Sequence, residues 1–155
     1  MSSARSDMRA KRSGTDPGTP LGTRIMAGSV GGLAGGIVFG LLMAMLGMLP
    51  MVASLVGSNS AIVGFLVHLV ISVLIGLALT IPAPGVLKKG LVISAVVGLV
   101  YGMLWWVLGP LLIMPTMMGM PILTLDGGSG ASLMGHAMYG LILGLVATIV
   151  VRRGR

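Results

Sequence analysis

Residues Gly36–Met48 read GIVFGLLMAMLGM, and residues Gly98–Pro110 read GLVYGMLWWVLGP. Six of the thirteen aligned positions are identical, and Phe39 aligns with Tyr101. A second pair of similar segments comes later in the chain: HLVISVLIGLALTI at His68–Ile81 aligns with HAMYGLILGLVATI at His136–Ile149. The chain therefore contains two related halves, and the prediction of its fold begins from this repetition.

The composition is that of a membrane protein. Of the 155 residues, 55% are apolar and only 8% are charged, and the mean hydropathy is +1.07. Soluble domains carry about 25% charged residues, so this chain has too few to cover a water-exposed surface. The sequence contains no cysteine, which excludes disulfides, thiolate metal sites and covalent haem attachment through cysteine.

Four uncharged apolar runs predict four transmembrane helices, since about 20 apolar residues are needed to cross ~30 Å of hydrocarbon. Lipid offers no partner to backbone N–H and C=O groups, so runs of this length are expected to be helical. Pro50 is expected to end the first run, and the Gly109-Pro110 pair the third. The runs are Ile25–Leu49, Ala61–Ile81, Gly90–Leu108 and Ala131–Val151. The fold class is therefore all-α, a polytopic membrane protein.

The basic residues predict the orientation in the membrane. All ten Lys and Arg residues lie on one side of a four-span arrangement, and the two opposite loops, residues 50–60 and 110–130, contain none. The positive-inside rule then places both termini in the cytoplasm, with the chain in the inner (plasma) membrane. The net charge of +7 thus requires no nucleic acid as a partner. The basic residues are Arg5, Arg9, Lys11, Arg12, Arg24, Lys88, Lys89, Arg152, Arg153 and Arg155.

The domain organisation follows from the spans and the repetition. Residues 1–23 are polar and basic and are expected to form a disordered cytoplasmic tail, whereas residues 24–155 form one four-helix transmembrane domain. Repeat 1 covers about residues 24–81 and repeat 2 about 86–151. Each repeat is a helical hairpin that begins and ends in the cytoplasm, so two parallel copies imply a pseudo-twofold axis along the membrane normal.

Small residues recur every four positions and predict close helix packing. Residues four apart lie on one helix face, and in lipid such smooth stripes let backbones approach closely. The glycines expected at helix contacts are Gly28, Gly32, Gly36 and Gly40 in the first span, Gly76 in the second, Gly98 and Gly102 in the third, and Gly144 in the fourth.

The two histidines are the clearest candidates for function. His68 and His136 are the only histidines, occupy equivalent positions in the two halves and lie inside apolar runs. An ionisable group inside a membrane span is a functional hypothesis because its desolvation must be compensated. One interpretation is a haem b held between both imidazoles. The other is a neutral histidine that hydrogen-bonds a carbonyl across a helix interface.

The methionines favour the predicted outer side of the membrane. Thioether sulfur with imidazole is a ligand set suited to Cu(I), so a copper site could combine the two histidines with nearby methionines. Methionine is equally an ordinary filler of irregular gaps in a packed interior. The candidate ligands are Met134, Met138, Met117 and Met118. Asp126, in the sequence DGGSG, is expected to be a turn residue before the fourth span.

The stretches MPTMMGMP at Met114–Pro121 and GHAMYGLILG at Gly135–Gly144 carry a resemblance. A four-span chain of this length with both motifs resembles a group of small prokaryotic membrane proteins with a Pro/Met-rich outer segment and a Gly-His-x-x-Tyr-Gly helix. The resemblance implies the four-span topology and no settled activity. The first repeat departs from the motif, since it reads VHLVIS where the second reads GHAMYG.

Three classes of function remain, and none is enzymatic, because three acidic residues supply no catalytic constellation. The first class is a structural or accessory membrane subunit, as a homo-oligomer or within a larger complex. The alternative is a haem b or Cu(I) protein that uses His68 and His136. A small oligomeric transporter or channel is the second alternative.

Overall fold

The computed structural model describes residues 18–154, and these residues form helices joined by short connections. Within this range, four stretches are long and apolar enough to cross a membrane, which confirms the predicted all-helical, four-span class. The long helices are α2 (Leu21–Met45), α4 (Ala61–Thr80), α6 (Leu91–Leu108) and α8 (Ser129–Arg153). The shorter elements are α3 (Leu49–Ala53), η1 (Ser54–Val56), α5 (Pro84–Lys88), η2 (Gly109–Ile113) and α7 (Met114–Met118).

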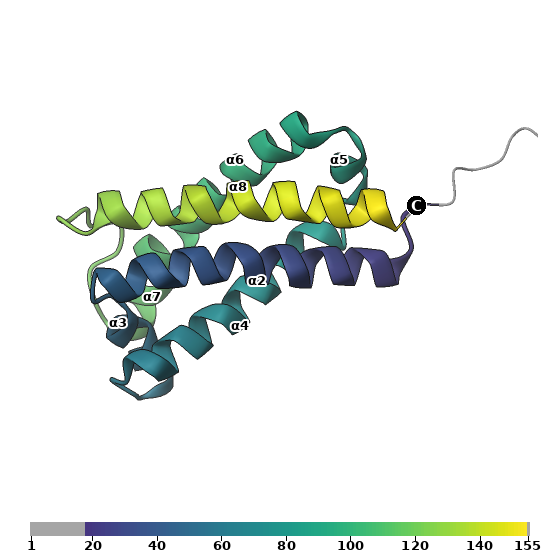
Figure 1. The fold of residues 1–155 in the computed structure, drawn as a ribbon. Coiled ribbons are helices and arrows are strands. Elements are labelled where there is room, and N and C mark those ends of the chain that lie inside the picture. The colour runs from purple at the N-terminus through teal and green to yellow at the C-terminus, as the bar shows by residue number, and fades with distance from the viewer. Residues whose placement is uncertain (1–17, 155) are drawn as a thin grey trace, which may run out of the picture.

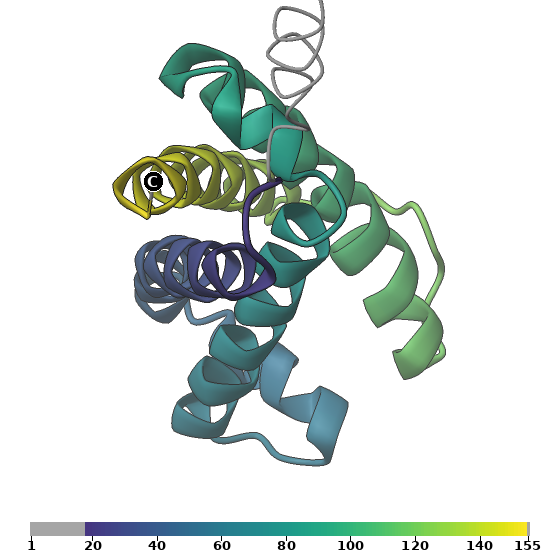
Figure 2. The same ribbon diagram turned by 90° about the vertical axis from the view of Figure 1, so that its right-hand side faces the viewer.

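Helices α2 and α8 form the centre of the bundle. They lie side by side and run in opposite directions, with the start of α2 and the end of α8 at the same end of the molecule (Figure 1). Helix α4 packs against α2, and α6 packs against α8. Viewed along the central pair, α4 and α6 lie on the same side of it (Figure 2). Tyr101 of α6 donates a hydrogen bond to the Ile75 carbonyl of α4 at 2.9 Å, which joins these two outer helices.

The first span is shifted toward the N-terminus relative to the prediction. Helix α2 begins at Leu21, directly after the N-cap residue Pro20, and ends at Met45, well short of the predicted Leu49. Gly47 has a φ of +69°, a left-handed conformation that stops the helix. Pro50 therefore does not end the span; it lies in the first turn of α3, where its missing N–H costs nothing. Of the predicted tail, residues 1–17 lie outside the described residues.

The third span is longer than predicted, so the expected end at Gly109-Pro110 is wrong. The chain continues from α6 through a π-helical turn, η2, into α7, and the whole span covers Leu91–Met118. Pro110 has no N–H to donate, and the wider π-turn accommodates its ring without breaking the helix. Gly119, with a φ of +65°, ends the span instead.

Backbone contacts at small residues join the two outer helices to the central pair. A Cβ placed on Gly76 of α4 would collide with the Gly28 carbonyl of α2. On the other side, a Cβ on Gly144 of α8 would collide with the Ser94 carbonyl of α6, and one on Gly98 with the Gly140 carbonyl. At these points the helices touch backbone to backbone, the kind of contact that small residues allow in lipid.

A second glycine face on α2 makes it a central helix. Gly31 and Gly35 face α8, where an added Cβ would lie 2.9 Å from the Leu143 side chain and 2.8 Å from the Tyr139 carbonyl, respectively. The residues of α6 aligned with these two glycines are Ile93 and Val97, which are too large for the same approach. The two halves are therefore packed unequally, since α2 contacts two long helices closely and α6 only one.

Candidate functional site

His68 lies at the interface between α4 and α2. Its side chain is 8% exposed, and its Nε2 lies 3.1 Å from the Gly36 carbonyl oxygen of α2. A neutral imidazole with its hydrogen on Nε2 donates to this carbonyl, and the Ser72 hydroxyl, one turn along α4, lies 3.5 Å from the same nitrogen. His68 thus uses its polar edge to tie two helices together.

His136 is bonded differently although it holds the equivalent sequence position. Its Nδ1 lies 2.8 Å from the Ser132 carbonyl oxygen, one turn earlier in the same helix α8. Its Nε2 faces the π-turn of the third span, where a Cβ on Gly109 would lie 4.0 Å away. Among residues 18–154, Nε2 has no hydrogen-bond partner. The bond of His136 therefore joins no second helix.

The ring of Phe39 on α2 packs against both histidines. Its ring centroid lies 5.1 Å from that of His68 and 4.7 Å from that of His136, both in edge-to-face geometry. Gly135 of α8 provides the room for this ring, because a Cβ there would collide with it. A ligand held by both imidazoles would have to share this site with the Phe39 ring, which lies against each of them. The haem b hypothesis stays a prediction.

The candidate methionine ligands lie on another face of α8 than His136 or are partly exposed on α7. Met134 and Met138 lie two residues before and after His136 on the continuous helix α8, and residues two apart do not face each other. Met117 and Met118, on α7, are 63% and 38% exposed, and the Met118 sulfur accepts from the Ser54 hydroxyl at 3.9 Å. Over the described part of the chain, no group of three or more His, Cys, Asp or Glu could hold a metal ion.

Two tyrosines add polar links that sequence reasoning missed. The hydroxyl of Tyr139, buried on α8, donates to the Ser72 carbonyl of α4, and Tyr101 donates to Ile75 on the same helix. A signal for Tyr139 was present, since it follows His136 by three residues and so shares its helix face. Helix α4 thus receives hydrogen bonds from α8 and α6, and gives one to α2 through His68.

Arg24 ties the start of α2 to the end of α4. Its guanidinium donates from Nε to the Thr19 carbonyl at 2.7 Å and from Nη1 to the Ile81 carbonyl at 3.1 Å. The Thr80 hydroxyl of α4 donates to the Arg24 carbonyl at 2.9 Å. The guanidinium thereby satisfies one carbonyl before α2 and one at the end of α4, a structural role.

Asp126 forms the turn before α8, as its sequence predicts. Its Oδ1 accepts hydrogen bonds from the Gly128 N–H at 2.9 Å and from the Ser129 hydroxyl at 3.0 Å. The bond from Ser129, followed by that from Gly128, holds the pKa of the fully exposed Asp126 carboxyl below its ordinary value. The carboxylate therefore stabilises a turn.

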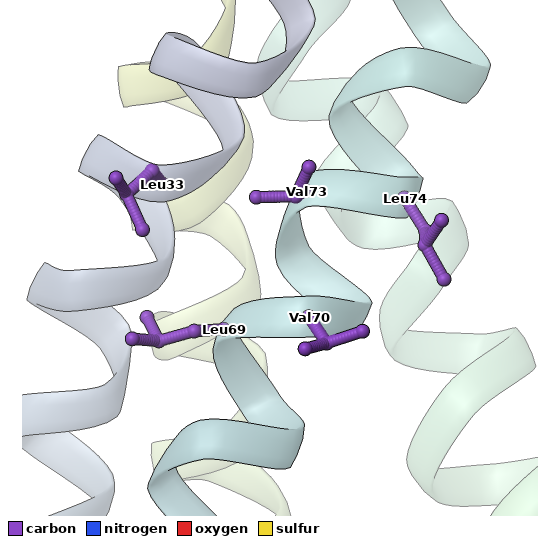
Figure 3. A pocket seen from close by; sticks show the side chains of 5 residues that line it. All are labelled: Leu33, Leu69, Val70, Val73 and Leu74. Atoms are coloured by element: carbon purple, nitrogen blue, oxygen red, sulfur yellow. The ribbon is translucent and has the colours of Figure 1, made fainter.

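A groove between α2 and α4 opens to the surface of the bundle and has a volume of about 320 Å³ (Figure 3). All the residues that line it are aliphatic: Leu33, Leu69, Val70, Val73 and Leu74. Such a lining offers contacts to hydrocarbon and no group for catalysis or coordination.

No family model, no curated protein and no solved structure matches this chain.

Proposed function

We propose that the protein is a non-enzymatic accessory subunit of a membrane complex, which acts by packing against other membrane proteins. One observation carries the proposal: the Phe39 ring packs edge-to-face against both His68 and His136. Both imidazoles are thus engaged in packing within the bundle. The hydrogen bonds of His68, His136 and both tyrosines go to backbone carbonyls within the bundle, which favours a rigid scaffold over a reactive site.

The outer helices supply the surface for such packing. In the most apolar 18-residue segments of α2 and α8, 44% of the residues are buried inside the bundle. The corresponding share is 28% for α4 and 17% for the third span. The exposed side chains of α6 are apolar, among them Val92 at 78% and Val100 at 60% exposure. In a bilayer this face contacts either lipid or the helices of a partner.

The orientation belongs to the same proposal, with both termini in the cytoplasm and the chain in the plasma membrane. Its support is the distribution of the described basic residues, which follow or precede helix ends on one side: Arg24, Lys88, Lys89, Arg152 and Arg153. Reporter domains fused to either terminus are expected to be cytoplasmic, and one inserted within residues 50–60 to be outside. Opposite locations for the two termini would contradict the four-span topology.

The first experiment separates the accessory function from the haem and copper alternative. Protein purified from cells supplied with haem and copper is expected to show no Soret band and no stoichiometric copper. The variants His68→Ala and His136→Ala are expected to fold and to differ from the wild type only in stability. A Soret band or bound copper that disappears in both variants would overturn the proposal in favour of the redox or metal function.

The second experiment tests the packing surface itself. After extraction in a mild detergent, the protein is expected to migrate on native gels in a complex larger than its own oligomers. Val100→Trp, which enlarges the exposed face of α6, is expected to release it. Leu41→Trp is the matched control, because Leu41 is 55% exposed on α2, and this variant is expected to stay in the complex. A chain that migrates without a partner before and after both changes would contradict an accessory role.

A further inference from the structure

The end of the bundle where α2 begins and α8 ends is strongly basic. All five basic residues among residues 18–154 lie there, whereas the sole acidic residue of that range, Asp126, lies at the opposite end before α8. The five residues are Arg24, Lys88, Lys89, Arg152 and Arg153.

Helix α5 fixes two of these cations in place. Leu87 of α5 is 1% exposed and packs in one cluster with Ala27 of α2 and Ala147 and Val151 of α8. Figure 1 shows α5 beside the C-terminal part of α8. Because Lys88 follows Leu87 directly, the buried leucine holds the basic end of α5 against the bundle.

The end of α8 brings the other two cations to the same place. Arg152 follows Val151, whose side chain is fully buried in the cluster with Leu87. The Nη2 atom of Arg152 lies 3.6 Å from the position that a Cβ on Gly90 would take, at the junction of α5 and α6. Gly90 has a φ of +117°, which only glycine adopts without strain. The basic ends of α5 and α8 are thus held together by packing.

We propose that Lys88, Lys89, Arg152 and Arg153 form a basic platform that binds the headgroups of anionic phospholipids. The four residues lie at or next to the ends of α5 and α8, where the spans are expected to meet the headgroup phosphates. The positive-inside rule concerns orientation during insertion. The platform adds a preference of the folded protein for one class of lipid, which goes beyond the accessory function.

The test uses full-length protein purified in a neutral detergent and titrated with phosphatidylglycerol or phosphatidylcholine while its unfolding temperature is measured. Phosphatidylglycerol is expected to raise that temperature more than phosphatidylcholine does, and added salt to reduce the difference. In Lys88→Gln/Lys89→Gln, and likewise in Arg152→Gln/Arg153→Gln, the apparent affinity for phosphatidylglycerol is expected to fall about tenfold. The pair Lys88→Arg/Lys89→Arg keeps the charge and is expected to retain the binding.

A further variant separates the platform from the other basic segment of the chain, which lies outside the described residues. Neutralising Arg5, Arg9, Lys11 and Arg12 is expected to leave most of the response to phosphatidylglycerol. Equal stabilisation by the two lipids would overturn the platform, as would a response lost in the tail variant and kept in both platform variants. The tail variant decides the matter even if a platform variant fails to fold, because a response to phosphatidylglycerol that is lost with the tail charges alone would overturn the platform.

Discussion

The pair α2–α4 and the pair α6–α8 use the same kind of contact in two different registers. Gly76 of α4 meets the Gly28 carbonyl, and its counterpart Gly144 of α8 meets the Ser94 carbonyl. In the sequence alignment, however, Gly28 corresponds to Gly90 and not to Ser94. The second pair is therefore displaced by one helical turn, because a small residue every four positions offers several equivalent registers.

This displacement changes what the aligned polar residues do. His68 donates to the Gly36 carbonyl on the neighbouring helix, whereas His136 bonds the Ser132 carbonyl of its own helix. A repeated small-residue pattern thus determines that two helices touch closely. It does not determine which polar atom meets which carbonyl. The pseudo-twofold relation expected between the two hairpins has to accommodate this difference in register.

The largest expected effect comes from the aligned positions Gly40 and Gly102. A Cβ on Gly102 would collide with the His136 carbonyl, which is part of the α8 backbone and cannot shift without moving the helix. A Cβ on Gly40 would lie 2.6 Å from the edge of the Phe65 ring, a side chain that can rotate away. Gly102→Ala is expected to cost about 3 kcal/mol of unfolding free energy and Gly40→Ala less than about 1 kcal/mol. Reversible unfolding in detergent micelles measures both.

Gly22→Ala is the control for this comparison, since nothing lies within 4 Å of a Cβ at that position of α2. It is expected to be neutral or to add up to about 1 kcal/mol through helix propensity. Equal losses in Gly40→Ala and Gly102→Ala would mean that the two pairs share one register and would contradict the displacement.

The next effect concerns the Phe39 ring, which contacts both histidines. Gly135→Ala is expected to cost about 1–3 kcal/mol, because the added methyl group collides with the Phe39 ring. Phe39→Leu removes the ring edge and is expected to recover part of that loss when the two changes are combined. A double-mutant cycle measures this coupling. Additive losses would show that Phe39 does not occupy the space beside Gly135.

The two aligned threonines should respond with opposite signs. Thr80 donates to the Arg24 carbonyl at 2.9 Å and to the Gly76 carbonyl at 3.1 Å, so Thr80→Val is expected to cost about 1 kcal/mol. Thr148 is fully buried, and within the described residues its hydroxyl has no partner. Thr148→Val is therefore expected to be neutral or slightly stabilising. A comparable loss in both variants would contradict the unequal bonding of the two halves.

The helices were predictable because lipid leaves a long apolar run no alternative to internal hydrogen bonding. The ends of the helices were less predictable. A proline ordinarily stops a helix, but Pro110 lies in a π-helical turn that continues the third span. The second glycine face of α2 was visible in the sequence, since Gly31 and Gly35 are four residues apart. The repeat does not predict this face, because the aligned residues of the second half, Ile93 and Val97, are large.

The candidate site was predictable only in part. Sequence symmetry places His68 and His136 at equivalent positions of their helices, but it cannot place Phe39, which reaches them from a third helix. Likewise, the spacing of Met134 and Met138 around His136 suggested a ligand set, although the period of a helix turns residues two apart to different faces. These positions depend on tertiary packing, about which a single repeat pattern carries no information.

The smallest expected effect distinguishes two connections, the one between α2 and α4 and the one between α7 and α8. The second contains Asp126, whereas the first, residues 46–60, has no acidic side chain. Hydrogen bonds from Ser129 and Gly128 lower the pKa of Asp126 in the folded state. Its contribution to stability is thus complete above the unfolded pKa and is lost as the pH falls through the folded pKa. Asp126→Asn keeps an oxygen acceptor but removes the titration, so the unfolding temperature of the wild type should fall more steeply than that of the variant between about pH 5 and pH 2. The other titrating groups are common to both proteins and cancel in the difference. Parallel curves across this range would mean that the turn before α8 does not depend on the carboxylate charge.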